Sequence, residues 1–126
     1  MIKALVSAVK LMVGAIALLL MVTTTVTAQE KDKVAEGAKT VTAQMKTQLV
    51  LNDNQQTQVL DVNRTYLKKV KDNKESGATA VQKAKKMQAL NEERDNKLKS
   101  VLTATQYKKY SADKVENTRK LRESIQ

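Results

Sequence analysis

Residues 102–107 read Leu-Thr-Ala-Thr-Gln-Tyr, and they form the clearest helix start in the sequence. The Thr103 side chain is suited to cap the first turn, and Gln106 can bond back to the Thr103 amide, which completes a capping box. Leu102 and Tyr107 occupy the two positions of a hydrophobic staple around that cap. We expect a helix that starts here, includes Tyr110, Val115, Leu121 and Ile125, and has a polar second half that either extends over a partner subunit or frays.

A partial copy of this stretch lies 51 residues earlier in the chain. Leu51 and Gln55 correspond to Leu102 and Gln106, while Asn52 stands in place of Thr103. Asparagine is also a good N-cap, so Asn52 and Gln55 predict a second capping box. The same offset relates Val50 to Val101 and Lys46 to Lys97. This weak internal repeat suggests two helical hairpins of common plan, although Gln56 cannot replace Tyr107 as a staple partner.

The rest of the chain also favours helix. Its few large aliphatic residues and high net charge approach the composition of disordered chains, but proline is absent and apolar residues recur at steps of three or four. We therefore predict an all-α fold of about four helices in two antiparallel hairpins. The first three are expected at 33–50, with Gly37 as a weak point, from Asn52 to Asp72 or Asn73, and at 79–101.

Each expected helix carries an apolar stripe that marks its buried face. The second helix should bury Val59, Val62, Tyr66 and Val70, flanked by Leu60 and Leu67; the third should present Val81 or Ala84, then Met87, Leu90, Leu98 and Val101. Arg94 interrupts the third stripe. We favour an arrangement in which its stem lies along the seam and its guanidinium reaches solvent; the alternative is a pair with a carboxylate on a neighbouring helix or subunit.

The composition argues against an enzyme. The chain has no cysteine and no histidine, so it lacks a thiolate nucleophile, an imidazole base and the usual zinc ligands. Glu92 and Glu93 are adjacent and point about 100 degrees apart on a helix, and Asp61 stands alone on its helix. We expect no catalytic residue, no metal site and no cofactor.

The first 28 residues read as a cleaved secretory signal peptide. Lys3 and Lys10 give a positive start, residues 11–22 are apolar or small, and Val26-Thr27-Ala28 ends in small residues suited to a cleavage site. The apolar run is too short to cross a bilayer as a helix, which disfavours the alternative of an uncleaved anchor. We therefore expect a periplasmic or secreted protein whose residues 29–126 form a single helical domain.

Charge indicates the partners. The full chain has 23 Lys and Arg against 13 Asp and Glu, a net charge of +10. An exported basic protein seldom meets nucleic acid, so we expect none as a partner; anionic membrane surfaces, polyanionic polymers and acidic unfolded proteins fit better. Because the core is thin, we also expect a homodimer.

Two lysine clusters flank the polar turn expected at 73–79. If the flanking helices form a hairpin, both clusters lie at one end, where they either bind an anionic partner or only keep the protein soluble. Tyr66 and Met87 are candidates for an adaptable binding surface, although core packing is the better first interpretation. The candidate binding residues are Lys68, Lys69, Lys71, Lys83, Lys85, Lys86, Tyr66 and Met87.

With its motif at 102–106 and the partial copy at 51–55, the sequence resembles the Spy/CpxP family of periplasmic proteins, whose hallmark is a pair of Leu-Thr-x-x-Gln motifs. The resemblance covers approximately residues 45–110. It implies a thin, curved, antiparallel dimer that forms a cradle with a basic, partly apolar concave face. It also implies an ATP-independent chaperone or envelope-stress adaptor, with unfolded or misfolded envelope proteins and a stress-sensor protein as partners. The family's metal-binding branches are not matched, because histidine and cysteine are lacking. The alternative is a structural helical protein that binds anionic membrane or polymer surfaces electrostatically.

Overall fold

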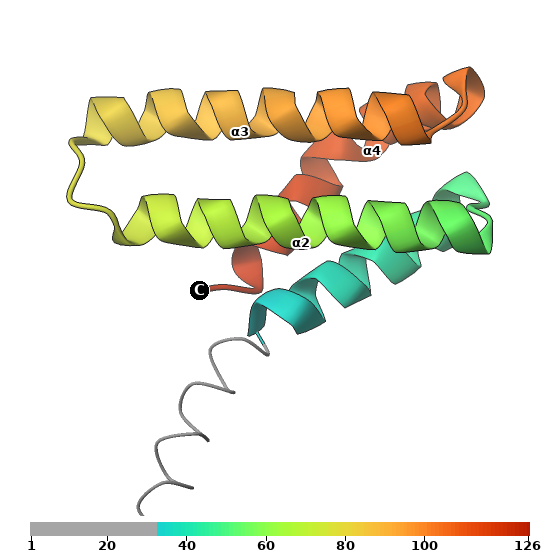
Figure 1. The fold of residues 1–126 in the computed structure, drawn as a ribbon, viewed down its shortest axis with the longest axis horizontal. Helices are drawn as coiled ribbons and strands as arrows, with labels where there is room; N and C mark the ends of the chain where they lie inside the picture. The colour runs from blue at the N-terminus through green and yellow to red at the C-terminus, as the bar shows by residue number, and fades with distance from the viewer. Residues whose placement is uncertain (1–32) are drawn as a thin grey trace, which may run out of the picture. The chain divides into compact units, whose positions relative to one another are not determined.

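A computed structural model describes residues 33–126, which form one all-helical unit (Figure 1). The expected signal peptide at 1–28 and the first four residues of the expected domain lie outside the described residues. The described part contains a helix at 33–49, α2 (Asp53–Glu75), α3 (Ala80–Val101) and α4 (Ala104–Glu123). The prediction of an all-α fold with four helices is confirmed.

The helices are arranged around an antiparallel pair. Figure 1 shows α2 and α3 side by side, joined at one end by the turn at 76–79. We call this turn and its flanking residues, 68–87 in all, the hairpin tip. At the other end, residues 50–52 connect the first helix to α2, and residues 102–103 connect α3 to α4. None of the helices within residues 33–126 is long and apolar enough to cross a membrane.

The core contains most of the predicted stripes. Val59, Val62, Tyr66 and Val70 are buried on α2, as are Leu90 and Leu98 on α3. The stripe of α3 does not extend to its first turns, because Val81 is 66% exposed and Ala84 is exposed. Val115, in the last helix, is also exposed.

Two details differ from the expected helix boundaries and ends. The second helix continues past Asp72 and Asn73 to Glu75, and the Asn73 side chain donates to the Lys83 carbonyl across the tip. The last helix does not end early: it runs to Glu123 and buries Asn117 and Leu121.

Gly37 is a packing position and the first helix runs through it without interruption. A Cβ atom there would lie 2.1 Å from Ser124 Oγ and 3.2 Å from Leu67 Cδ2. The first helix, α2 and the end of α4 therefore meet closely at this point, and only glycine leaves the space they need.

Candidate functional site

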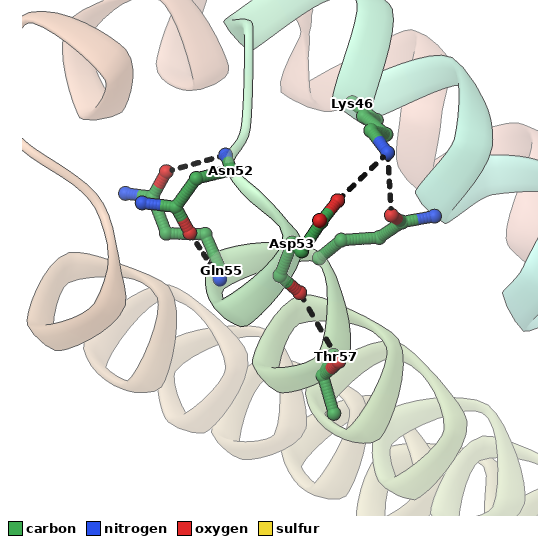
Figure 2. A network of polar contacts seen from close by, with 6 residues as sticks. Lys46, Asn52, Asp53, Gln55 and Thr57 are labelled. Atoms are coloured by element: carbon green, nitrogen blue, oxygen red, sulfur yellow. Dashed lines mark hydrogen bonds and ion pairs between the residues drawn. The ribbon is translucent and has the colours of Figure 1, made fainter.

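The two predicted capping boxes are confirmed. Figure 2 shows Asn52 and Gln55, where the Gln55 amide donates to Asn52 Oδ1 at 2.7 Å and the Asn52 amide donates to Gln55 Oε1 at 3.2 Å. At the start of α4, the Gln106 amide donates to Thr103 Oγ1 at 3.2 Å and the Thr103 amide donates to Gln106 Oε1 at 2.9 Å. Both boxes satisfy amide groups that the first turn of a helix leaves without partners.

The two boxes also bind each other. Gln55 Nε2 donates to Gln106 Oε1 at 2.8 Å, and Gln106 Nε2 lies 3.2 Å from Gln55 Oε1. Each side chain also reaches a carbonyl at the end of another helix: Gln55 Nε2 donates to Val101 O, and Gln106 Nε2 donates to Leu49 O, both at 3.2 Å. This glutamine junction gives the internal repeat a structural meaning, because equivalent residues of the two halves make equivalent bonds.

The residues of the hydrophobic staple lie around this junction. Leu51 and Leu102 are buried, and Tyr107 is half-buried with its ring centroid 5.8 Å from that of Tyr110. Gln56, at the position equivalent to Tyr107, instead accepts a hydrogen bond from Lys46 Nζ at 2.8 Å. The seven residues predicted for the capping motif therefore lie together around one end of the helical unit.

Sequence reasoning missed a third capping box at the start of α3. The Gln82 amide donates to Thr79 Oγ1, and the Thr79 amide donates to Gln82 Oε1, both at 3.2 Å. The signal was present, since residues 79–82 read Thr-Ala-Val-Gln. A Thr-x-x-Gln sequence thus marks a helix start, whereas the junction is what distinguishes the pair at 55 and 106.

A polar layer crosses the middle of the core, and Arg94 is its centre. Arg94 is only 3% exposed, so the expected solvent-directed guanidinium was wrong. Its Nε donates to Asn63 Oδ1 at 3.2 Å and its Nη1 donates to Thr118 Oγ1 at 2.9 Å. The guanidinium carbon lies 5.1 Å from the Tyr66 ring centroid and 5.5 Å from that of Tyr110, so two aromatic rings stabilise the charge.

The alternative carboxylate partner for Arg94 is also not found. Within residues 33–126 no carboxylate lies within ion-pair distance of Arg94, and its Nη2 has no hydrogen-bond partner. Burial therefore lowers the pKa of Arg94, although an arginine remains charged in proteins. In this layer, the Arg94 cation is stabilised by the faces of two tyrosine rings and by uncharged hydrogen-bond acceptors.

Both buried tyrosines bond to α3. The Tyr66 hydroxyl donates to Asn91 Oδ1 at 2.5 Å, and the Tyr110 hydroxyl donates to Asp95 Oδ1 at 2.9 Å. Desolvation raises the pKa of Tyr66 and, more strongly, that of Tyr110. Tyr66 is 3% exposed, so it belongs to the core and offers no surface for a partner; Tyr110, which lies off the stripes read from the sequence, is completely buried.

The structure brings the two lysine clusters to the same end of the α2–α3 hairpin (Figure 1). Two of the six are engaged: Lys69 donates to Glu93 at 2.7 Å, and Lys83 donates to the Lys74 carbonyl at 3.0 Å. Lys69 and Lys97 together hold the pKa of the Glu93 carboxyl below its usual range. The other four, Lys68, Lys71, Lys85 and Lys86, form no ion pair within the described residues.

A groove lies beside these lysines, where α2, the start of α3 and the end of α4 meet. We call it the tip groove; its volume is about 260 Å³. Val70, Met87 and Ile125 supply its apolar lining, and Met87 is only partly buried. The remaining lining residues are Asn73, Lys74, Lys83, Arg122 and Gln126. Of the two apolar candidates named from the sequence, Met87 thus lies in a groove with cationic borders, whereas Tyr66 does not.

The described part of the protein, residues 33–126, contains no recognisable metal site. Among residues 33–126, no group of three carboxylates is placed to hold a metal ion. The tip groove instead combines an apolar lining with cationic borders.

A comparison with known protein families shows which family the chain belongs to. A family model described as a domain of unknown function (DUF4890) matches residues 24–110. The chain belongs to the DUF4890 family. No curated protein and no solved structure matches it.

The DUF4890 match includes every residue of the glutamine junction. It also includes the six lysines of the two clusters and Met87, so most of the tip groove belongs to the family region. The second half of α4, with Arg122, and the residues after it, with Ile125, follow the DUF4890 region in the chain.

Proposed function

We propose that this DUF4890 protein is an exported, ATP-independent chaperone or envelope-stress adaptor of Spy/CpxP type, which binds unfolded or misfolded proteins at its hairpin tip. The observation that carries the proposal is the tip groove, where Val70, Met87 and Ile125 are bordered by Lys74, Lys83 and Arg122. An acidic unfolded chain offers both of the complementary properties, since it exposes carboxylates and apolar side chains together.

The two kinds of contact have different tasks. Lysines without an acidic partner attract a negatively charged chain over a distance of about one Debye length, roughly 10 Å at 0.1 M salt. The apolar lining then provides short-range contacts, in which a methionine adapts to side chains of different shape. Because the groove is small, such contacts are weak enough for a client to fold while bound.

The competing proposal is a helical protein that attaches to anionic membrane or polymer surfaces by charge alone. The exposed lysines Lys68, Lys85 and Lys86 and the half-buried Lys71 favour it, because they would serve either function. Salt separates the two, since a purely electrostatic complex dissociates as the Debye length shortens to a few ångströms.

The test is aggregation of a chemically denatured acidic client after dilution, without ATP, at low and at moderate salt. We expect the purified protein to suppress aggregation near stoichiometric amounts at both salt concentrations. Replacement of the tip lysines Lys83, Lys85 and Lys86 by glutamine should weaken suppression. The matched control is glutamine at Lys99, Lys108 and Lys109, three exposed lysines far from the tip along α3 and α4.

Met87→Ser tests the apolar contribution and should reduce suppression mainly at moderate salt. No suppression at either salt concentration would refute the chaperone proposal, and suppression lost at moderate salt would favour the electrostatic alternative. Homodimer formation is part of the same proposal, and light scattering of the purified protein tests it.

A further inference from the structure

A second groove lies between α3 and α4, away from the turn of the hairpin tip. Its volume is about 510 Å³, within the range of small-molecule sites. We call it the α3–α4 groove. Its lining residues are Asn91, Lys114, Val115, Thr118, Arg119, Arg122, Glu123 and Gln126.

Asn91 and Thr118, two uncharged residues of this groove, can donate hydrogen bonds to a ligand, because their oxygen atoms already accept bonds from buried residues. Asn91 Oδ1 accepts the Tyr66 hydroxyl proton, so the amide nitrogen of Asn91, which can only donate, is left for a ligand. Thr118 Oγ1 accepts from Arg94 Nη1, so the Thr118 hydroxyl proton must point elsewhere. Both residues therefore favour a ligand rich in acceptors.

The charges agree with this preference. Three cations line the groove, against the single carboxylate of Glu123. Arg119 already binds Glu123 and also pairs with Glu116, which is not part of the lining. Lys114 pairs with Asp95, which is not part of the lining, and Arg122 has no ion pair among residues 33–126. The buried charge of Arg94 lies directly behind Thr118 without a carboxylate to balance it, which adds a positive field.

We propose that the α3–α4 groove binds an oxyanion of the phosphate monoester type, with Asn91, Thr118 and Arg122 as donors to its oxygens. The same group occurs in soluble phosphate esters and in the headgroup of phosphatidic acid. The groove shares Arg122 and Gln126 with the tip groove, but its lining differs in chemistry, because it is almost entirely polar and has only Val115 as an apolar member.

Isothermal titration of the purified protein with inorganic phosphate and with glycerol phosphate tests the proposal, alongside sedimentation with vesicles that contain phosphatidic acid. Asn91→Asp keeps the acceptor for Tyr66 but replaces the donor amide by a carboxylate, so we expect affinity to fall by about tenfold or more. The matched control is Asn96→Asp, which makes the same charge change at an exposed position of the same helix. Arg122→Gln should also weaken binding, whereas Arg64→Gln, exposed on α2, should not.

Circular dichroism tests whether each variant is folded. If Asn91→Asp does not fold, Arg122→Gln still tests the proposal. Saturable binding of the soluble esters identifies a small ligand, and variant-sensitive binding of vesicles alone identifies a lipid headgroup. The proposal is overturned if none of the three probes binds, or if Asn91→Asp and Arg122→Gln bind as well as their controls.

Discussion

Gln55 and Gln106 form a reciprocal pair of side-chain amides, with donor–acceptor distances of 2.8 and 3.2 Å, across 51 residues of chain. Each glutamine also completes the capping box of its own helix. Each side chain therefore caps the start of its own helix and joins it to the start of another helix at the same time. Loss of either glutamine leaves the other without its partner.

We predict that Gln55→Ala and Gln106→Ala each destabilise the protein by about 1–3 kcal/mol, because amide and carbonyl groups lose their partners. The two effects should not add. A double-mutant cycle from urea denaturation should show a coupling of about 0.5–3 kcal/mol. Additive losses would show that the pair is not an energetic unit.

Gly37→Ala should destabilise the protein by about 1–3 kcal/mol even though alanine favours helix, because its Cβ would overlap Ser124 and press on Leu67. Thermal denaturation followed by circular dichroism measures the effect. Gly77→Ala is the matched control, since no atom lies within 4 Å of its new Cβ. Adding Ser124→Gly to Gly37→Ala should restore part of the loss; no recovery would locate the clash elsewhere.

Val50 ends the first helix with a φ of 56°, in the left-handed region that a β-branched residue rarely adopts. Its side chain is 82% exposed, so it contributes little packing that a substitution would remove. Val50→Gly should stabilise the protein by about 1 kcal/mol, measured by the urea midpoint. A lower urea midpoint for Val50→Gly would contradict a strained, left-handed backbone at residue 50.

Arg94→Ala should cost about 3–5 kcal/mol, because it leaves Asn63 and Thr118 without a donor and opens a cavity between two tyrosine rings. Arg94→Met fills the same space and removes the buried charge, so its loss of stability should be clearly smaller. Chemical denaturation of the two variants provides the comparison. Equal losses would mean that the hydrogen bonds of Arg94, and not its packing, dominate this position.

Alkaline pH should destabilise the fold through its buried tyrosines. Burial raises the pKa of Tyr110 above the ordinary value of 10.0, so above about pH 10 the unfolded chain releases protons that the folded protein retains. The stabilisation from the protonated form is complete below pH 10 and is lost as the pH rises beyond it. Melting temperatures across this range should fall less steeply for Tyr110→Phe, with Tyr107→Phe as the control; equal slopes would contradict the assignment to Tyr110.

The helix starts at Asn52 and Thr103 could be predicted because a capping box depends on four consecutive residues and on nothing distant. The same locality explains why the buried faces of α2 were predictable from their spacing. The spacing did not predict the exposure of the first turns of α3, because no other helix covers Val81 and Ala84 at the projecting tip.

The polar layer could not be predicted in the same way. Arg94 reads as an interruption of an apolar stripe, since a sequence does not show which acceptors and rings a distant helix will bring to it. Tyr110 was missed for a related reason: its burial depends on how α4 crosses α3, and not on the spacing within α4. For the candidate sites, the sequence indicated the tip lysines and Met87, but not the α3–α4 groove, which exists only through tertiary contacts.

The position of the glutamine junction also bears on the order in which the protein folds. The α2–α3 hairpin closes across the four residues 76–79, so its formation requires little loss of chain entropy. The junction joins residues 51 apart and needs both helix starts in place before its bonds can form. We therefore expect the central hairpin to form early, and the closure at Gln55 and Gln106 to complete the native state.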